Sequence, residues 1–311
     1  MAGWLVVVVL AVALAVGCGG DDAPKEPRRS TPKITGAGVT GSGRLVDVGG
    51  RSLYVECVGS GSPTVLLEAG FGGRSVNWAA VFPALAQTTR TCAYDRAGLG
   101  SSVARPGVHD AGDEINDLEQ LLDRARIAPP YVLVGHSYGG LLVRLFARAH
   151  PDETAGVVLV DAMGRDATRR LLALWPTSLA PALRRSWAEP VVEGVDLAAS
   201  EALDRSLRSL GGKRLMVISA GRRGELFAEL PSRLRGRVQR LSRVMQTELA
   251  GLSSDHVHVV ALRSGHFVQA ADHQPLVVIR AVQAVVRAHR NNGQLPACER
   301  LFSGPDVRCL S

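Results

Sequence analysis

The most restrictive feature of this chain is the pentapeptide Gly-His-Ser-Tyr-Gly at positions 135–139, which lies between a strand-like and a helix-like segment. The apolar run Tyr-Val-Leu-Val at 131–134 directly precedes it, and residues 141–149 continue with a helical pattern. The two glycines have no Cβ, so the backbone can make a tight turn that lifts a serine hydroxyl clear of a sheet edge. The sequence therefore predicts a strand, a sharp turn and a helix, with Ser137 as a candidate nucleophile. The alternative is an ordinary tight turn with a surface serine.

Short apolar runs alternate with helical patterns along most of the chain. Alternating residues at 44–48 and 52–58, on either side of Gly49-Gly50, predict an antiparallel hairpin. The later strand-like runs lie at 64–68, 90–94, 131–134, 157–160, 215–218 and 256–262, and the helical patterns lie at 78–86, 115–124, 141–149 and 275–287. Buried strands that alternate with helices indicate an α/β domain over residues 44–290, with a mostly parallel sheet covered on both faces.

A long segment, residues 163–212, interrupts this alternation where a single helix would be enough. We expect it to form a helical cap, and the alternative is an enlarged crossover that only adds core. Four of its residues recur at helical spacing and would form an apolar face over Ser137: Leu171, Leu172, Leu174 and Trp175.

The composition fits one catalytic domain, because 311 residues with 46% hydrophobic content can bury one substantial core. The formal net charge of +7 comes mostly from scattered arginines, with a local excess at 222–243. Neither a nucleic-acid-binding motif nor interleaved aromatic residues accompany them. We therefore expect no nucleic-acid partner. The arginines would instead form a solvated basic surface that lies near anionic lipid.

The N-terminus contains an apolar run at 5–16 that is too short to span a bilayer comfortably. This run predicts an export signal over residues 1–17. The small residues before Cys18 resemble those of a bacterial lipoprotein signal, which implies lipidation of Cys18 and a membrane-anchored protein that faces outside; the alternative is a secreted protein. Residues 18–43 are rich in Gly, Pro, Ser, Thr and charge, so we expect a flexible tether.

Export would place the remaining four cysteines in an oxidising compartment, where they are expected to form disulfides. Four thiols allow three pairings. Cys298 and Cys309 bracket a short stretch of the C-terminal tail, residues 291–311, so their pairing closes an easy local loop and leaves Cys57 with Cys92. A metal site is the rival, but no two of these cysteines have C-x-x-C spacing and no histidine cluster joins them, so no metal is expected.

A serine nucleophile needs a general base within hydrogen-bond reach, and histidine has a suitable pKa for that task. The chain contains eight histidines. His266, in Ser-Gly-His-Phe at 264–267, follows the last predicted strand and so lies at the same sheet edge as Ser137. We therefore predict His266 as the base, with serine first and histidine last in the chain.

Three further motifs are shared with one known family. Residues 68–73, Glu-Ala-Gly-Phe-Gly-Gly, resemble the loop after the third strand of the α/β-hydrolase fold; residues 94–102 resemble its D-R-x-G-x-G-x-S turn; and residues 264–267 resemble its histidine loop. Together with the serine pentapeptide they give a resemblance to that fold over residues 43–290. The resemblance implies an eight-stranded sheet of order 1-2-4-3-5-6-7-8, in which the strands with Cys57 and Cys92 are neighbours.

The resemblance also implies how the site would stabilise an oxyanion. The family uses two backbone amides, one from the residue after the nucleophile and one from the loop after the third strand. These correspond to Tyr138 and Phe71, with Gly70 as the near alternative. Such donors are worth about 2.7–4 kcal/mol each when they point at the developing charge.

The acid that orients the histidine is less clearly marked. The commonest family pattern has an aspartate a few residues after the seventh strand, where this chain offers only Glu225. Asp161 ends the sixth strand at the catalytic edge, whereas Asp255 precedes the last strand and lies at the wrong edge. We therefore predict Asp161 as the third triad member, with Glu225 as the alternative.

These features predict an exported serine hydrolase that cleaves an ester of a small or medium acyl group through an acyl-enzyme. It would act on a small-molecule substrate and need no cofactor. An amidase or aminopeptidase-like activity is the nearest rival, and a surface binding protein without turnover is the alternative from another class. A serine at this position argues against haloalkane dehalogenase and epoxide hydrolase chemistry, which in this fold use aspartate.

Overall fold

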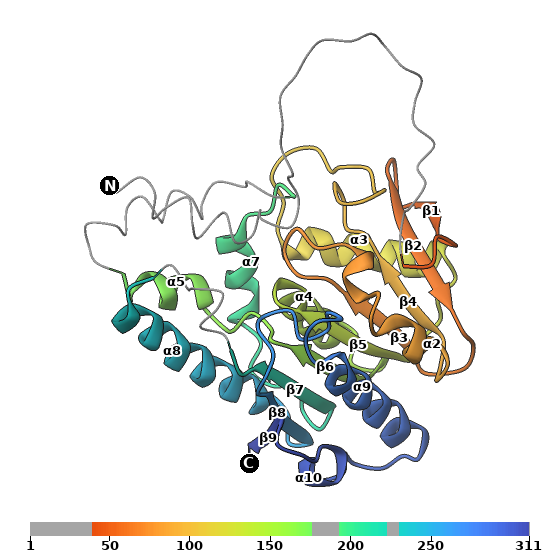
Figure 1. The fold of residues 1–311 in the computed structure, drawn as a ribbon. Coiled ribbons are helices and arrows are strands. Elements are labelled where there is room, and N and C mark those ends of the chain that lie inside the picture. Colours follow the sequence, from red (N-terminus) through yellow and green to blue (C-terminus); the bar gives the residue numbers. More distant parts are fainter. Residues whose placement is uncertain (1–38, 176–192, 223–229, 311) are drawn as a thin grey trace, which may run out of the picture.

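A computed structural model describes residues 39–175, 193–222 and 230–310 (Figure 1). Several predictions concern residues outside these ranges: the export signal at 1–17, Cys18, most of the tether, part of the proposed cap and Glu225. Within the described ranges, no helix is both long enough and apolar enough to cross a membrane.

The core of the domain is a single sheet of nine strands, ordered β1-β2-β4-β3-β5-β6-β7-β8-β9. The strands are β1 (Arg44–Asp47), β2 (Ser52–Val58), β3 (Thr64–Glu68), β4 (Thr91–Tyr94), β5 (Tyr131–His136), β6 (Thr154–Val160), β7 (Arg214–Ala220), β8 (His256–Ala261) and β9 (Val307–Leu310). The strands from β4 to β8 in this order are parallel to one another, whereas β1, β2 and β9 pair antiparallel with their neighbours. The predicted α/β fold and the order of its first eight strands are confirmed.

The expectation of eight strands was one short. The ninth strand, β9, lies in the C-terminal tail, where Cys309 pairs with Val259 of β8. It has only four residues and none of them is fully buried. Its pattern alone is therefore too weak to predict a strand, and its backbone hydrogen bonds to β8 are what define it.

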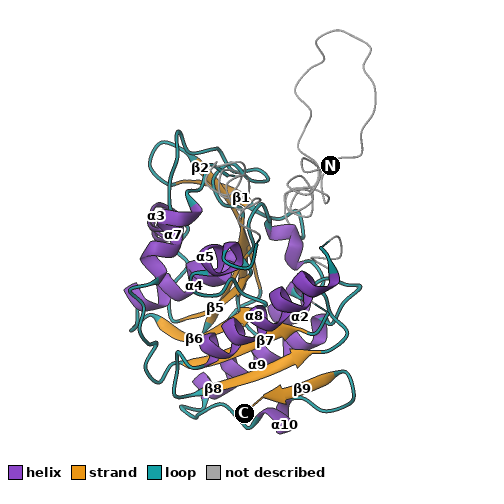
Figure 2. Cartoon of the chain, turned by 90° about the vertical axis from the view of Figure 1, so that its left-hand side faces the viewer, coloured by secondary structure: helices purple, strands orange, loops and turns teal. Residues whose placement is uncertain are grey.

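Helices cover both faces of the sheet (Figure 2). They are η1 (Ser75–Trp78), α2 (Phe82–Ala86), α3 (Ala111–Arg124), α4 (Tyr138–Ala149), α5 (Ala167–Leu172), α7 (Leu197–Asp204), α8 (Ser232–Ala250), α9 (Pro275–Arg290) and α10 (Cys298–Leu301). Val157 and Leu159 of β6 pack in one apolar cluster with α3, α4 and α8, while Val158 and Val160 pack in another with α2, α9 and α10. This alternation follows from the period of two along a strand, and it buries both faces.

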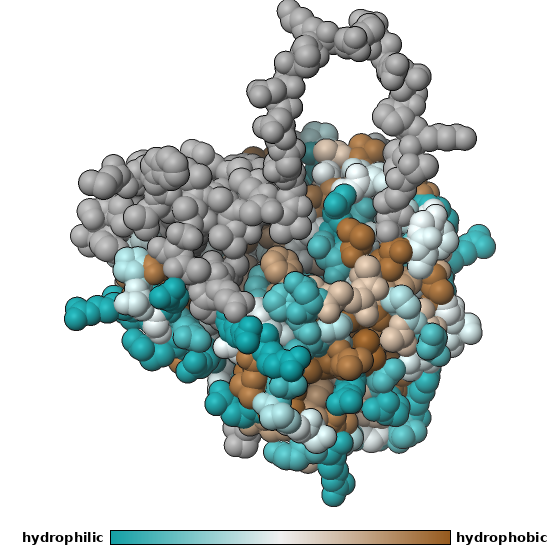
Figure 3. All heavy atoms as spheres, viewed as in Figure 1, coloured by the Kyte–Doolittle hydropathy of each residue, from teal (hydrophilic) through white to brown (hydrophobic). Residues whose placement is uncertain are grey.

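Helix α8, the longest of the described helices, was missed by the sequence analysis. Its first half coincides with the arginine-rich segment that we interpreted only as a basic surface. Val238, Met245 and Leu249 are buried at helical spacing on its inner face, and the arginines between them hide this pattern. Hydrophilic side chains gather along the outer face of α8 in Figure 3. Arg237 and Arg240 of this helix are exposed.

The described parts of the proposed cap contain α5 and α7. Leu172 and Trp175, with the partly buried Leu171 and Leu174, pack against Leu230 and against Leu234 and Val238 of α8. The surface that this apolar face covers is therefore α8, and our placement of it over Ser137 was wrong. The insertion reaches the serine turn through other residues, because Met163, Val195 and Leu197 cluster with Tyr138.

Two disulfides join the cysteines in the predicted pairs. Cys57 and Cys92 are directly opposite each other in the antiparallel β2–β4 pair, with Cα atoms 4.1 Å apart, slightly closer than the usual range of about 4.4–6.8 Å. Residues directly opposite each other in an antiparallel pair approach to about 4.5 Å, so the strand pairing favours a short separation, and the observed one is shorter still. Cys298 and Cys309 have Cα atoms 5.8 Å apart and close the C-terminal tail.

Candidate active site

Ser137 occupies the sharp turn between β5 and α4 that the pentapeptide predicts. Its backbone has φ 52° and ψ −120°, a left-handed conformation that is unfavourable for a residue with a side chain. The flanking glycines are required: a Cβ on Gly135 would lie 2.4 Å from the carbonyl oxygen of Gly139, and a Cβ on Gly139 would lie 2.4 Å from that of Ala69. Only glycine at both positions lets the chain make this turn at the carboxyl end of β5.

His266 and Asp161 form a close pair at the same edge of the sheet. Nδ1 of His266 lies 2.6 Å from Oδ2 of Asp161, which directly follows β6 and has a fully buried side chain. The other carboxylate oxygen accepts a hydrogen bond from the N–H of Ala220, at 3.0 Å. A carboxylate accepts, so Nδ1 is the donor and Nε2 is the nitrogen that can take a proton. Asp161 thus contacts the predicted base; the position of Glu225 is outside the described residues.

The loop that contains His266 lies beside the serine turn. Nε2 of His136, the residue before Ser137, donates a hydrogen bond to the backbone carbonyl of His266 at 3.0 Å, and the two rings are 4.6 Å apart. In the described residues Oγ of Ser137 forms no hydrogen bond with His266, a contact that in many apo enzymes tightens only with substrate. The pentapeptide places His136 in the turn, but nothing in the sequence predicts its contact with the histidine loop.

The expected oxyanion donors lie on the other side of Ser137. The loop after β3 passes so near that a Cβ on Gly70 would be 3.0 Å from Cβ of Ser137. The rings of Phe71 and Tyr138 meet edge to face with centroids 5.6 Å apart. Tyr138 is the first residue of α4, where backbone N–H groups have no acceptor within the helix. The hydrogen bonds found across the described ranges include none from the N–H of Phe71 or Tyr138.

A buried cluster of charged side chains adjoins this loop, and the sequence analysis did not predict it. Arg96 lies at its centre, with Nη1 2.6 Å from a carboxylate oxygen of Glu68 and Nε 3.3 Å from one of Glu114. Both oxygens of Glu193, in the insertion, accept from Arg96 at 2.7 Å. Burial raises the pKa of Glu68 to about 7, although Arg96 opposes this effect.

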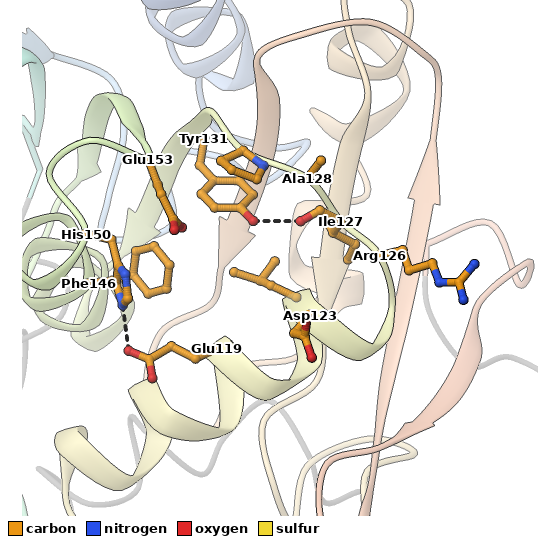
Figure 4. A pocket seen from close by; sticks show the side chains of 11 residues that line it. Glu119, Asp123, Arg126, Ile127, Ala128, Tyr131, Phe146, His150 and Glu153 are labelled. Carbon is orange, nitrogen blue, oxygen red and sulfur yellow. Dashed lines mark hydrogen bonds and ion pairs between the residues drawn. The ribbon is translucent and has the colours of Figure 1, made fainter.

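Two hollows in the described structure lie at the opposite edge of the sheet. One of about 460 Å³ is lined by Tyr131, where β5 begins, and by Phe146 and His150 at the end of α4 (Figure 4). Its polar groups have partners: the Tyr131 hydroxyl donates to the carbonyl of Ile127, and His150 pairs with Glu119 at 2.6 Å. The other, of about 500 Å³, is lined by Cys57 and residues 59–62 among others. Neither hollow includes Ser137 or His266.

Nowhere in residues 39–175, 193–222 and 230–310 do three or more His, Cys, Asp or Glu side chains form a group that could hold a metal ion.

Comparison with known proteins agrees with the fold. The family described as alpha/beta hydrolase fold matches residues 63–183, which include the serine turn. The chain is 32% identical to the uncharacterized protein YqjL of Bacillus subtilis over 174 residues, 55% of this chain and 66% of YqjL. It is 33% identical over 138 residues to 2-hydroxy-6-oxo-2,4-heptadienoate hydrolase of Pseudomonas putida, covering 43% of this chain and 50% of that enzyme.

Solved structures also share the architecture. A thermophilic esterase of Thermogutta terrifontis superimposes with a TM-score of 0.54 over 80% of this chain and 99% of its own, at 21% identity. The chain spans between 15% and 66% of the length of the first curated relatives that it matches. The strand order, the serine turn and the family match together place this chain in the α/β-hydrolase superfamily.

Proposed function

We propose that this protein is a serine hydrolase that cleaves carboxylic esters through a Ser137–His266–Asp161 triad. The observation that supports this most strongly is the joint placement of a strained serine and a buried aspartate–histidine pair at the carboxyl ends of β5, β6 and β8. Strain at a serine is costly, and it is usual where the hydroxyl must be presented to a substrate. The fold supports many chemistries, so these residues and not the fold are the basis of the proposal.

In the proposed reaction, Nε2 of His266 takes the proton of the Ser137 hydroxyl as Oγ attacks the acyl carbonyl. Asp161 holds the ring orientation and stabilises the imidazolium that forms. The N–H groups of Phe71 and Tyr138 bind the oxyanion of the tetrahedral intermediate. His266 then returns the proton to the leaving alcohol, and water cleaves the acyl-enzyme by the same steps.

The surroundings of Ser137 favour an ester with a small or medium apolar acyl group. Phe71, Met163 and Leu197 are partly buried and pack in one apolar cluster with the buried Tyr138 and Val195, next to the serine turn. An apolar wall of this kind would bind an acyl chain and exclude water from the reacting carbonyl.

We further propose that the protein is exported and anchored to the outer side of the membrane by a lipid on Cys18. Two observations support this: the two disulfides, which are compatible with an oxidising compartment, and the apolar run that ends shortly before Cys18. The mass of the mature N-terminal peptide of exported protein tests it. A diacylglyceryl modification on Cys18 is expected, and an uncleaved N-terminus would contradict the proposal.

Turnover of a chain-length series of p-nitrophenyl esters tests the activity. Wild-type protein should hydrolyse short and medium esters, and Ser137→Ala should lower kcat by about 10³-fold or more, because the hydroxyl is the nucleophile. The variant should keep the wild-type circular dichroism and Tm within a few degrees. More than a tenth of wild-type turnover in Ser137→Ala would contradict the mechanism.

A further inference from the structure

The loop that contains Phe71 is held from two directions by charged side chains. Arg96 donates to the backbone carbonyl oxygens of Ala69 and Gly70, each at 2.7 Å. On the far side of Phe71, a carboxylate oxygen of Glu193 accepts the N–H of Gly72 at 2.5 Å. The backbone on both sides of Phe71 is thus fixed, whereas its own N–H forms no hydrogen bond within the described residues.

These contacts determine where the N–H of Phe71 points. A trans peptide is planar, so the carbonyl of Gly70 and the N–H of Phe71 point in opposite directions from the same plane. Since Arg96 binds that carbonyl, the N–H is turned away from Arg96. Gly70 also lies close to Ser137, since a Cβ added to Gly70 would be 3.0 Å from Cβ of Ser137. The donor is therefore presented in a fixed direction beside the nucleophile.

Arg96 can hold this position only while its own charge is compensated. It is 3% exposed, and a buried guanidinium without carboxylate partners would be strongly unfavourable. Burial lowers the pKa of Arg96, but Glu193, Glu68 and Glu114 outweigh it and keep the pKa well above the ordinary value. Glu193 contributes both of its oxygens, each 2.7 Å from Arg96.

Glu193 belongs to the insertion, not to the sheet. The segment that follows it is docked on the loop before α3: the N–H of His109 donates to the carbonyl of Gly194 at 3.1 Å, and the N–H of Asp196 donates to the carbonyl of His109 at 2.7 Å. The insertion thereby delivers one carboxylate that contacts both the arginine and the oxyanion loop.

We propose that Arg96 and Glu193 are positioning residues for the oxyanion donor of Phe71, so that docking of the insertion through Glu193 completes the oxyanion hole. This inference rests on the proposed ester hydrolysis. It assigns a role in charge stabilisation to the insertion, separate from any contact that the insertion makes with substrate.

The test compares Glu193→Ala and Glu193→Gln with Glu248→Ala as a matched control. Glu248 of α8 pairs with Arg170 of α5 at 2.5 Å, so it also ties the insertion to the body, but it does not contact the oxyanion loop. For each variant, kcat and KM on a p-nitrophenyl ester are measured per active site, counted by complete labelling with a fluorophosphonate. The affinity of an alkyl boronic acid, which forms a tetrahedral adduct with serine, reports on the oxyanion hole.

Glu193→Ala should lower kcat by about tenfold or more and weaken boronate binding by a similar factor, because one oxyanion donor is misaligned. KM should change by less than about threefold, since ground-state binding is not involved. Glu193→Gln keeps an acceptor for the N–H of Gly72, so its kcat and boronate affinity should lie between those of Glu193→Ala and wild type. If Glu193→Ala does not fold, Glu193→Gln provides the test. Glu248→Ala should keep kcat and boronate affinity within about twofold of wild type, even where its Tm falls.

A kcat in the Glu193 variants equal to that of Glu248→Ala would overturn the inference, as would a change confined to KM. Failure of the inference is distinguishable from failure of the proposed function. In the first case Ser137→Ala is inactive while the Glu193 variants are normal, and in the second Ser137→Ala itself remains active.

Discussion

The two sides of Ser137 are built in different ways. On the histidine side, Asp161 and His266 follow β6 and β8, and the amide that fixes Asp161 belongs to Ala220 at the end of β7. On the oxyanion side, the loop after β3 depends on Arg96 after β4 and on Glu193 in the insertion. The groups that transfer the proton are therefore held by three strands of one sheet, whereas the oxyanion donor depends on charges from separate segments. Changes in the insertion should affect charge stabilisation more than proton transfer.

The largest effect is expected for the histidine side of this comparison. Asp161→Asn should lower kcat by about 10³-fold or more, because the amide cannot stabilise the imidazolium or hold the correct tautomer. Glu225→Gln should leave kcat within about twofold of wild type. Steady-state kinetics on the same ester measure both. Were the losses reversed, Glu225 would be the triad acid and Asp161 a structural residue.

The sheet beneath His266 should lose stability on acidification. His258 of β8 is buried and its Nε2 lies 2.6 Å from Oγ of Ser219 on β7. Burial, assisted by the nearby His256, lowers the pKa of His258 from 6.5 to about 4. A depressed pKa means that the folded state binds fewer protons than the unfolded state between these values. The stabilisation is therefore present above pH 6.5 and is lost as the pH falls through about 4.

Urea unfolding at pH 7 and pH 4 measures this contribution. The wild type should lose about 3 kcal/mol of unfolding free energy more than His258→Gln between these two values, which follows from the size of the pKa difference. His256→Gln, a change at the exposed first residue of β8, should keep most of the wild-type pH dependence, because burial is the larger cause of the lowered pKa of His258 and His256 the smaller. Equal pH dependence of His258→Gln and wild type would refute the assignment.

A smaller effect on kcat is expected from the hydrogen bond that joins His136 in the serine turn to the loop of His266. His136→Phe keeps an aromatic ring beside His266 but removes the hydrogen bond to its backbone carbonyl. One such bond is worth about 1 kcal/mol, so kcat should fall about fivefold while KM stays nearly constant. Stopped-flow acylation rates separate this effect from deacylation. A wild-type acylation rate in His136→Phe would mean that the histidine loop is positioned without this bond.

The histidine side of Ser137 could be predicted from the sequence, whereas the charged contacts on the oxyanion side could not. Ser137 is flanked by glycines at the spacing that is typical of a sharp turn. Asp161 and His266 each follow an apolar strand. Local patterns were therefore enough to predict where all three residues lie. Arg96 and Glu193 are 97 residues apart, and nothing near either residue indicates a partner. Ion pairs between distant segments depend on tertiary packing, which has no sequence period.

Helix α8 and strand β9 also depend on tertiary contacts, and neither was predicted. Arginines lie on both sides of the apolar stripe of α8 and obscure its helical pattern. Strand β9 is short, and only its pairing with β8 identifies it as a strand. Leu171, Leu172 and Trp175 were predicted to need an apolar partner, and they have one, but the identity of that partner as α8 could not follow from spacing alone. Periodicity indicates that a face is buried, and it does not indicate against what.

The most direct test of the account is peptide mapping after reaction with a fluorophosphonate. We predict one adduct per chain, on the peptide that contains Ser137, with loss of ester turnover in proportion to labelling. We also predict no adduct in Ser137→Ala. An adduct on another residue with loss of activity, or full turnover in a protein completely labelled at Ser137, would contradict the assignment of Ser137 as the nucleophile.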